Sequence, residues 1–185
     1  MPYRASDSPI GPDHPLRRLF SGIVEQVFMV ELGICDPKLT DYMASILTDF
    51  VHVDQIFRLR NVDGTAIREV SRMEAEAQLG PQADGTQRTA TVYRYIGDFT
   101  LFWTGLYPEA LRLRSGGADR LTEYVLQGKR SYGIASELVS ADQSPSQSLL
   151  RDLSERFEHC VHGLHLVRGA WSAGGSRHGD ALTGN

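Results

Sequence analysis

Cysteine is scarce in this sequence, and its scarcity excludes two kinds of stabilising crosslink. The 185 residues include only Cys35 and Cys160, which lie far apart and form no CxxC pair. A disulfide framework and a cysteine-rich zinc site both need more cysteines at closer spacing. We therefore expect two free thiols, both buried.

Long hydrophobic runs and an excess of basic residues are also missing. No stretch approaches the roughly 18 uninterrupted apolar residues of a membrane-spanning helix, and the first residues contain no apolar signal-peptide core. The formal net charge of -4 argues against a general nucleic-acid binder. Positions 112–130 are locally rich in arginine, but Asp119 and Glu123 dilute that charge. The composition predicts a soluble cytoplasmic protein with no nucleic-acid or membrane partner.

Signature motifs of catalysis are absent as well. The sequence contains no G-x-S-x-G and no H-E-x-x-H motif. The Gly128-Lys129 pair does not form a phosphate-binding P-loop, because position 123 is Glu123 instead of glycine and Arg130 follows the lysine. Nucleophilic catalysis therefore has no support, and we expect no catalytic residue and no cofactor.

The sequence does contain one helix that is apolar or small on nearly every side. In the run from Val92 to Glu109, large apolar residues recur at helical spacing and form a stripe about 120° wide. The stripe consists of Val92, Tyr95, Ile96, Phe99, Phe102, Trp103 and Leu106. The opposite flank carries Gly97, Thr100 and Thr104, which are small enough to let a second helix approach closely. Such a helix belongs at the centre of a bundle, with Phe99 and Trp103 among its least accessible side chains.

Helix start and stop signals divide the rest of the chain into further helices. Besides the central helix at about 87–107, prolines, capping residues and glycine turns predict helices at 16–32, 37–60, 65–79, 108–114, 119–139 and 144–171. No segment alternates as a strand. The fold class is therefore all-α, an irregular antiparallel bundle of about five long and two short helices. The polar ends at 1–15 and 172–185 are expected to be disordered around a single domain at 16–171.

The last predicted helix carries a tempting metal motif. Glu155, Glu158, His159 and His162 recur at spacings of three and four, which place side chains on one helical face. However, the core stripe of this helix lies on the other side, and a carboxylate-bridged di-iron bundle needs inward Glu-x-x-His motifs on two helices. We expect an exposed histidine face and no metal centre, with metal binding at these four residues as the alternative.

Arg94 and Asp98 are the only charged residues between Val92 and Tyr107, and their spacing of four lets them pair. Because they lie beside the core stripe, one interpretation is a structural ion pair that tethers the central helix to a neighbour. The other is a pocket in which Arg94 binds an anion. Its apolar walls would be Tyr93, Trp103 and Tyr107.

The remaining polar side chains form no convergent cluster that the sequence can identify. Glu31 and Asp54 lie in or beside apolar stripes, but each has an ordinary explanation at a helix end or in an ion pair. The leading hypothesis is a non-catalytic interaction or adaptor protein that binds a protein partner or itself. The alternative is a helical bundle that binds a small molecule or a metal, with enzyme activity left open.

Overall fold

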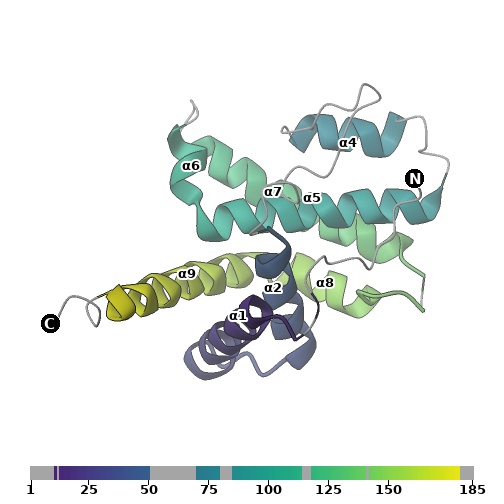
Figure 1. Ribbon diagram of the computed structural model, residues 1–185. Helices are drawn as coiled ribbons and strands as arrows, with labels where there is room; N and C mark the ends of the chain where they lie inside the picture. Colours follow the sequence, from purple (N-terminus) through teal and green to yellow (C-terminus); the bar gives the residue numbers. More distant parts are fainter. Residues whose placement is uncertain are drawn as a thin grey trace, which may run out of the picture.

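A computed structural model describes residues 11, 13–50, 70–79, 85–113, 118–140 and 142–179 (Figure 1). Every regular element within these ranges is a helix, so the all-α prediction is confirmed. The described elements are α1 (Pro15–Glu25), the π-helix η1 (Gln26–Glu31), α2 (Pro37–Phe50), α4 (Val70–Leu79), α5 (Thr86–Leu106), α6 (Pro108–Leu113), α7 (Ala118–Leu138), α8 (Gln147–Glu155) and α9 (Phe157–Gly179). In these ranges no helix is long and apolar enough to cross a bilayer.

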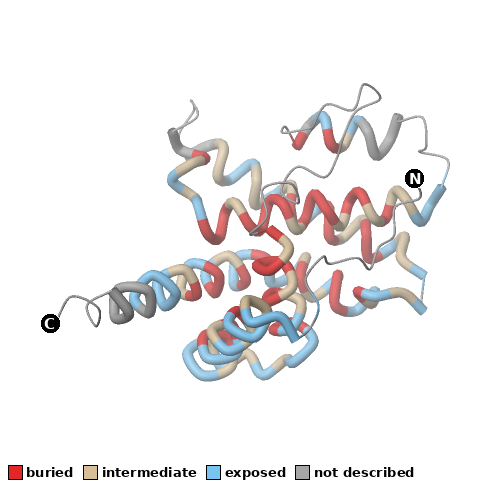
Figure 2. Tube along the Cα trace, viewed as in Figure 1, coloured by how far each residue is buried: buried red, intermediate tan, exposed pale blue. Residues whose placement is uncertain are grey.

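Helix α5 lies at the centre of the fold, as its sequence predicts. It packs against α7, α9, α4 and α2, and Figure 2 shows buried residues along most of its length. Phe99 is 3% exposed. Trp103 is only partly buried, so the prediction that it is among the least accessible side chains is wrong. It lies near the end of α5, where its ring contacts the exposed ring of Tyr107.

The small residues of α5 allow the close helix contacts that the sequence predicts. A Cβ atom added at Gly97 would lie 2.7 Å from the ring of Tyr132 on α7, and one at Gly105 would lie 2.6 Å from Leu164 on α9. Gly128 of α7 packs against Thr100 in the same way, because a Cβ atom added at Gly128 would lie 2.5 Å from the Thr100 hydroxyl. These contacts set the antiparallel register of α5 and α7, in which position 97 lies opposite 132 and position 100 opposite 128.

The sequence signals at helix starts work as expected. Asp36 Oδ1 accepts hydrogen bonds from the backbone N–H groups of Lys38 and Leu39, so it caps the helix that begins at Pro37. Gly33 adopts a positive φ of 68°, a conformation that glycine takes without steric cost.

Three local predictions are wrong. The segment predicted as one last helix is two, because the backbone leaves helical geometry at Arg156 (φ -104°, ψ 23°). This break lets α8 lie against α7 while α9 packs on α5. Helix α9 then continues to Gly179, beyond the predicted end at Trp171. Cys160 is buried as expected, whereas Cys35 is exposed in the connection before α2.

The first predicted helix is not α-helical throughout, because its last part forms the π-helix η1. The wider turn buries two neighbouring side chains, Val27 and Phe28, and the Phe28 ring packs against Gly163 of α9. The second half of the helix predicted at 37–60, including Asp54, and the start of the one predicted at 65 lie outside the described residues.

Candidate functional site

Side chains from two other helices converge on the carboxylate of Asp98 in α5. Its Oδ1 atom accepts a hydrogen bond of 2.6 Å from the hydroxyl of Tyr42 on α2 and one of 2.7 Å from the hydroxyl of Tyr132 on α7. Tyr132 is fully buried, and its ring lies directly over Gly97, the residue before Asp98. The glycine therefore makes room for the ring whose hydroxyl binds the next side chain.

The surroundings of Asp98 oppose its ionisation on balance. Burial is the largest cause and raises the pKa of this carboxyl, and the negative charge of Asp49 adds to the effect. The positive charge of Arg94 and the two tyrosine hydroxyls lower the pKa, but they do not cancel the effect of burial. Burial and the neighbouring Asp98 also raise the pKa of Tyr132 well above its ordinary value, so this phenol stays protonated and donates.

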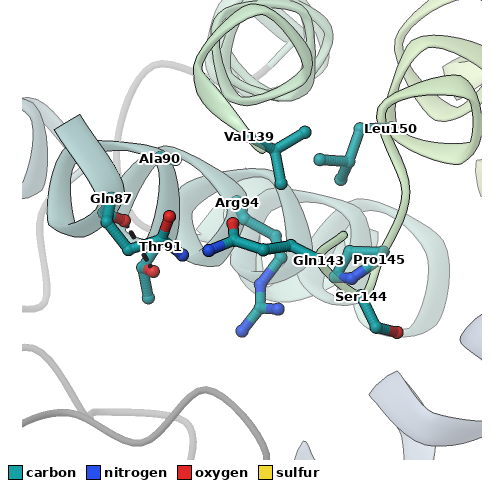
Figure 3. Close-up of a pocket in the computed structure, with 9 residues that line it drawn as sticks. All are labelled: Gln87, Ala90, Thr91, Arg94, Val139, Gln143, Ser144, Pro145 and Leu150. Carbon is teal, nitrogen blue, oxygen red and sulfur yellow. Dashed lines mark hydrogen bonds between the residues drawn. The ribbon is translucent and has the colours of Figure 1, made fainter. Parts of the chain in front are cut away.

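One helical turn before Asp98, Arg94 lines a pocket of about 230 Å³ between α5, α7 and α8 (Figure 3). In this view its guanidinium lies between Thr91 on one side and Ser144 on the other. The other residues that line the pocket come from α5, the α7–α8 connection and the first turn of α8. They are Gln87, Ala90, Val139, Gln143, Pro145 and Leu150.

The pocket and the Asp98 cluster are neighbours along the α5–α7 contact. Val139 follows Tyr132 by seven residues, about two helical turns, while Arg94 precedes Asp98 by about one turn in the antiparallel helix. Arg94 therefore connects the two regions: it lines the pocket and its charge acts on the Asp98 carboxyl. The structure thus contains a convergent polar constellation that sequence reasoning did not identify.

The side chains predicted as pocket walls lie elsewhere. Tyr93 is buried, while Trp103 and Tyr107 belong to a run of ring contacts that also includes Phe99 and Phe102. None of the three predicted walls is among the residues lining the Arg94 pocket. Binding of an anion by Arg94 stays a prediction, but the residues that line the pocket differ from the predicted ones.

Sequence reasoning missed most of the site. Tyr42 and Tyr132 are not among the residues predicted for the site, and the one available signal was that a buried tyrosine hydroxyl needs a hydrogen-bonding partner. Asp98, beside the core stripe of α5, was a candidate for that partner. Gln87, Thr91 and the connection residue Gln143 carried no signal, because only the folded chain brings them together.

The histidine face lies in solvent. Glu155, His159 and His162 are exposed, and Glu158 forms an ion pair with Lys129 of α7 at 2.8 Å. The hydrogen bond from Lys129 lowers the pKa of Glu158. Across the described ranges, no three His, Cys, Asp or Glu side chains come close enough together to hold a metal ion.

A second pocket, of about 380 Å³, lies between the end of α5 and the last part of α9. It is lined by Leu106, Tyr107, Arg168, Trp171 and Ser172. The guanidinium of Arg168 stacks over the Tyr107 ring, donates to the Leu106 carbonyl at 2.5 Å and pairs with Glu109 at 2.6 Å. Through these contacts Arg168 of α9 holds α6 in place.

Comparisons with known proteins give no family for this chain. No family model matches it, and no curated protein or solved structure matches it either.

Proposed function

We propose that this protein binds a small anionic molecule in the pocket lined by Arg94. The observation that carries the proposal is the position of the Arg94 guanidinium, in the wall of a 230 Å³ pocket that combines uncharged hydrogen-bonding side chains with apolar ones. A concave, partly apolar site with a few converging polar groups is the usual form of a small-molecule site.

The chemistry of arginine suits this role. A guanidinium carries five N–H donors in a planar fork, so it can bind an anionic ligand while it still interacts electrostatically with Asp98. The tyrosines support this arrangement, because Tyr42 and Tyr132 hold the Asp98 carboxylate in place and share its charge.

Binding without catalysis fits the residues present. The described residues that line the pocket include the hydroxyls of Thr91 and Ser144, but no His, Cys, Asp, Glu or Lys side chain that could activate them as nucleophiles or transfer a proton. Asp98 and Tyr132 are hydrogen-bonded to each other and do not line the pocket. The proposal is therefore a binding protein, such as a sensor or carrier of its ligand.

The interaction or adaptor hypothesis stays a prediction. The sequence offers a partner one surface, formed by Ser45, Ile56 and Leu59 opposite the core stripe of the second predicted helix. Ile56 and Leu59 lie outside the described residues, and Ser45 is partly buried. The exposed large apolar residues are spread over several elements, a distribution that is normal for a protein surface. In the part of the chain that the structure describes, they are Leu19, Val30, Tyr107, Leu126 and Trp171.

Native mass spectrometry of protein purified from its own host tests the proposal. We expect a small acid to remain bound to the wild type and to be lost in Arg94→Met. Arg151→Met is the matched control, because Arg151 is exposed on α8 beside the pocket residue Leu150 but does not line the pocket. A wild type without bound acid, or an Arg94→Met variant that retains it, would contradict the proposal.

A further inference from the structure

The charge, lining and size of the Arg94 pocket restrict the class of ligand. Resting on the proposed function, we infer that the ligand is a small monocarboxylate with a compact apolar body. In the proposed complex the carboxylate lies against Arg94, and the apolar body packs in the space between α5, the end of α7 and α8.

The charge of the site matches one negative charge better than two. Arg94 is the one cationic side chain among the described residues that line the pocket, and the hydrogen-bonding side chains there are uncharged. Asp98, one turn away, and Asp49 on α2 lie close enough to interact electrostatically with each other. A dianion such as a phosphate monoester would bring a second negative charge toward these carboxyl groups with no second cation in the lining to balance it.

The geometry of the guanidinium also favours a carboxylate. Its two parallel N–H groups match the two oxygens of a carboxylate, which gives a short and charge-assisted pair of hydrogen bonds. Gln87 and Gln143 add amide N–H donors to the same wall. An uncharged ligand would leave this donor-rich side of the pocket poorly satisfied.

The apolar residues of the lining favour a ligand with an apolar body. They are Ala90, Val139, Pro145 and Leu150, of which Val139 is the most exposed. These side chains have no hydrogen-bonding groups to offer a polyhydroxylated or highly charged ligand. Burial of an apolar group against them is favourable by about 25 cal/mol for each Å² removed from water.

The volume of the pocket limits the size of the body. An engineered protein cavity of about 150 Å³ binds benzene, and one water occupies about 30 Å³. The 230 Å³ of this pocket therefore accommodates one ring or a short chain of similar bulk together with a carboxylate. Pockets for drug-sized ligands usually measure about 300–1,000 Å³, so this pocket is smaller than that range.

Isothermal titration of the full-length chain with defined probes tests this inference. The probes are benzoate and hexanoate, their uncharged amides benzamide and hexanamide, and inorganic phosphate. We expect at least one of the acids to bind at least about tenfold more tightly than its amide, the factor that separates a charge-assisted hydrogen bond from a neutral one. Arg94→Met should remove this preference, and Arg151→Met should keep it.

The outcomes separate this inference from the proposed function. Phosphate binding that depends on Arg94, without binding of either carboxylate, would overturn the monocarboxylate inference but leave an anion-binding protein. Equal binding of acids and amides, unaffected by Arg94→Met, would overturn both. If no probe binds the wild type, the monocarboxylate inference is wrong, and the bound acid sought by native mass spectrometry decides the proposed function. The comparison of acid with amide uses the wild type, so it holds even if Arg94→Met does not fold.

Discussion

Helices α5 and α9 each carry charged or polar residues at helical spacing, but these residues are packed against neighbouring helices on α5 and exposed to solvent on α9. On α5, Arg94 and Asp98 face neighbouring helices, and two tyrosines from α2 and α7 reach the Asp98 carboxylate. On α9, His159 and His162 are exposed and gather no metal-binding group among the described residues. Spacing along one helix determines which side chains share a face, but the other elements decide whether that face becomes a site.

A pair of glycine substitutions should give the largest contrast between the two regions. Gly97→Ala places a Cβ atom 2.7 Å from the buried Tyr132 ring, whereas Gly169→Ala on α9 meets nothing within 4 Å. We expect Gly97→Ala to lower the free energy of unfolding by about 1 to 3 kcal/mol through overpacking. Gly169→Ala should raise it by about 0.5 to 1 kcal/mol, because alanine favours helix. Urea unfolding measures both, and equal effects would contradict the packing described for α5.

Double-mutant cycles should distinguish the two charged pairs next. For Arg94→Met with Asp98→Asn we expect a coupling of about 0.5 to 2 kcal/mol, within the range for residues that interact directly. The matched cycle is Lys129→Met with Glu158→Gln, an ion pair on the surface of α7 and α9. Its coupling should be smaller, at most about 0.5 kcal/mol, because exposed pairs are screened by water. Additive effects at Arg94 and Asp98 would show that the two side chains do not interact.

The pH dependence of stability should have opposite signs in the two regions. The pKa of Asp98 is raised, so its contribution to stability is fully present below its ordinary pKa of 3.8 and is lost as the pH rises through its value in the folded protein. The pKa of Glu158 is lowered, so its contribution is present above its ordinary pKa of 4.5 and is lost as the pH falls. The free energy of unfolding of Asp98→Asn, compared with that of the wild type, should therefore increase as the pH rises from 3.8. The free energy of unfolding of Glu158→Gln, compared with that of the wild type, should decrease as the pH rises toward 4.5. Unfolding measured across this range checks both signs, and the same sign for both variants would contradict the assignment.

The histidine face should give the smallest effect. Replacing His159 and His162 together with glutamine should change the free energy of unfolding by no more than about 0.5 kcal/mol per site, as for other exposed positions. Metal content, measured by elemental analysis, should not change. Stoichiometric zinc or iron in the wild type that is lost in the double variant would show that the histidine face of α9 binds a metal.

The sequence predicts the central helix well because the relevant information is local. The stripe around Phe99 and the small flank at Gly97 and Thr100 are visible in a single run of residues, and the prolines and caps mark where helices begin. The break at Arg156 could not be predicted in this way, because the apolar stripe continues through Leu153 and Phe157 on both sides of it. Only the competing contacts of α8 and α9 with different neighbours require the break.

The candidate site was only partly predictable for the same reason. Arg94 and Asp98 were identifiable as a pair because they are the charged residues of an otherwise apolar helix. The donors to Asp98 lie 56 and 34 positions away in the chain, so no spacing within one helix indicates them. The residues opposite Arg94 come from the connection between α7 and α8, whose path depends on where the two helices pack.

We propose that the ligand of this protein binds in the Arg94 pocket and not at the histidine face or in the pocket between the ends of α5 and α9. Methyl NMR spectra recorded during a titration with benzoate or hexanoate, whichever of the two binds, are the sharpest test, because methyl groups of Ala90, Val139 and Leu150 lie in the pocket wall. We expect the methyl signals of these three residues to shift together with one saturating dissociation constant, and the shifts to vanish in Arg94→Met. Shifts confined to residues around Trp171 or on the exposed face of α9, or no saturable shift of the methyl signals of Ala90, Val139 and Leu150, would overturn the assignment.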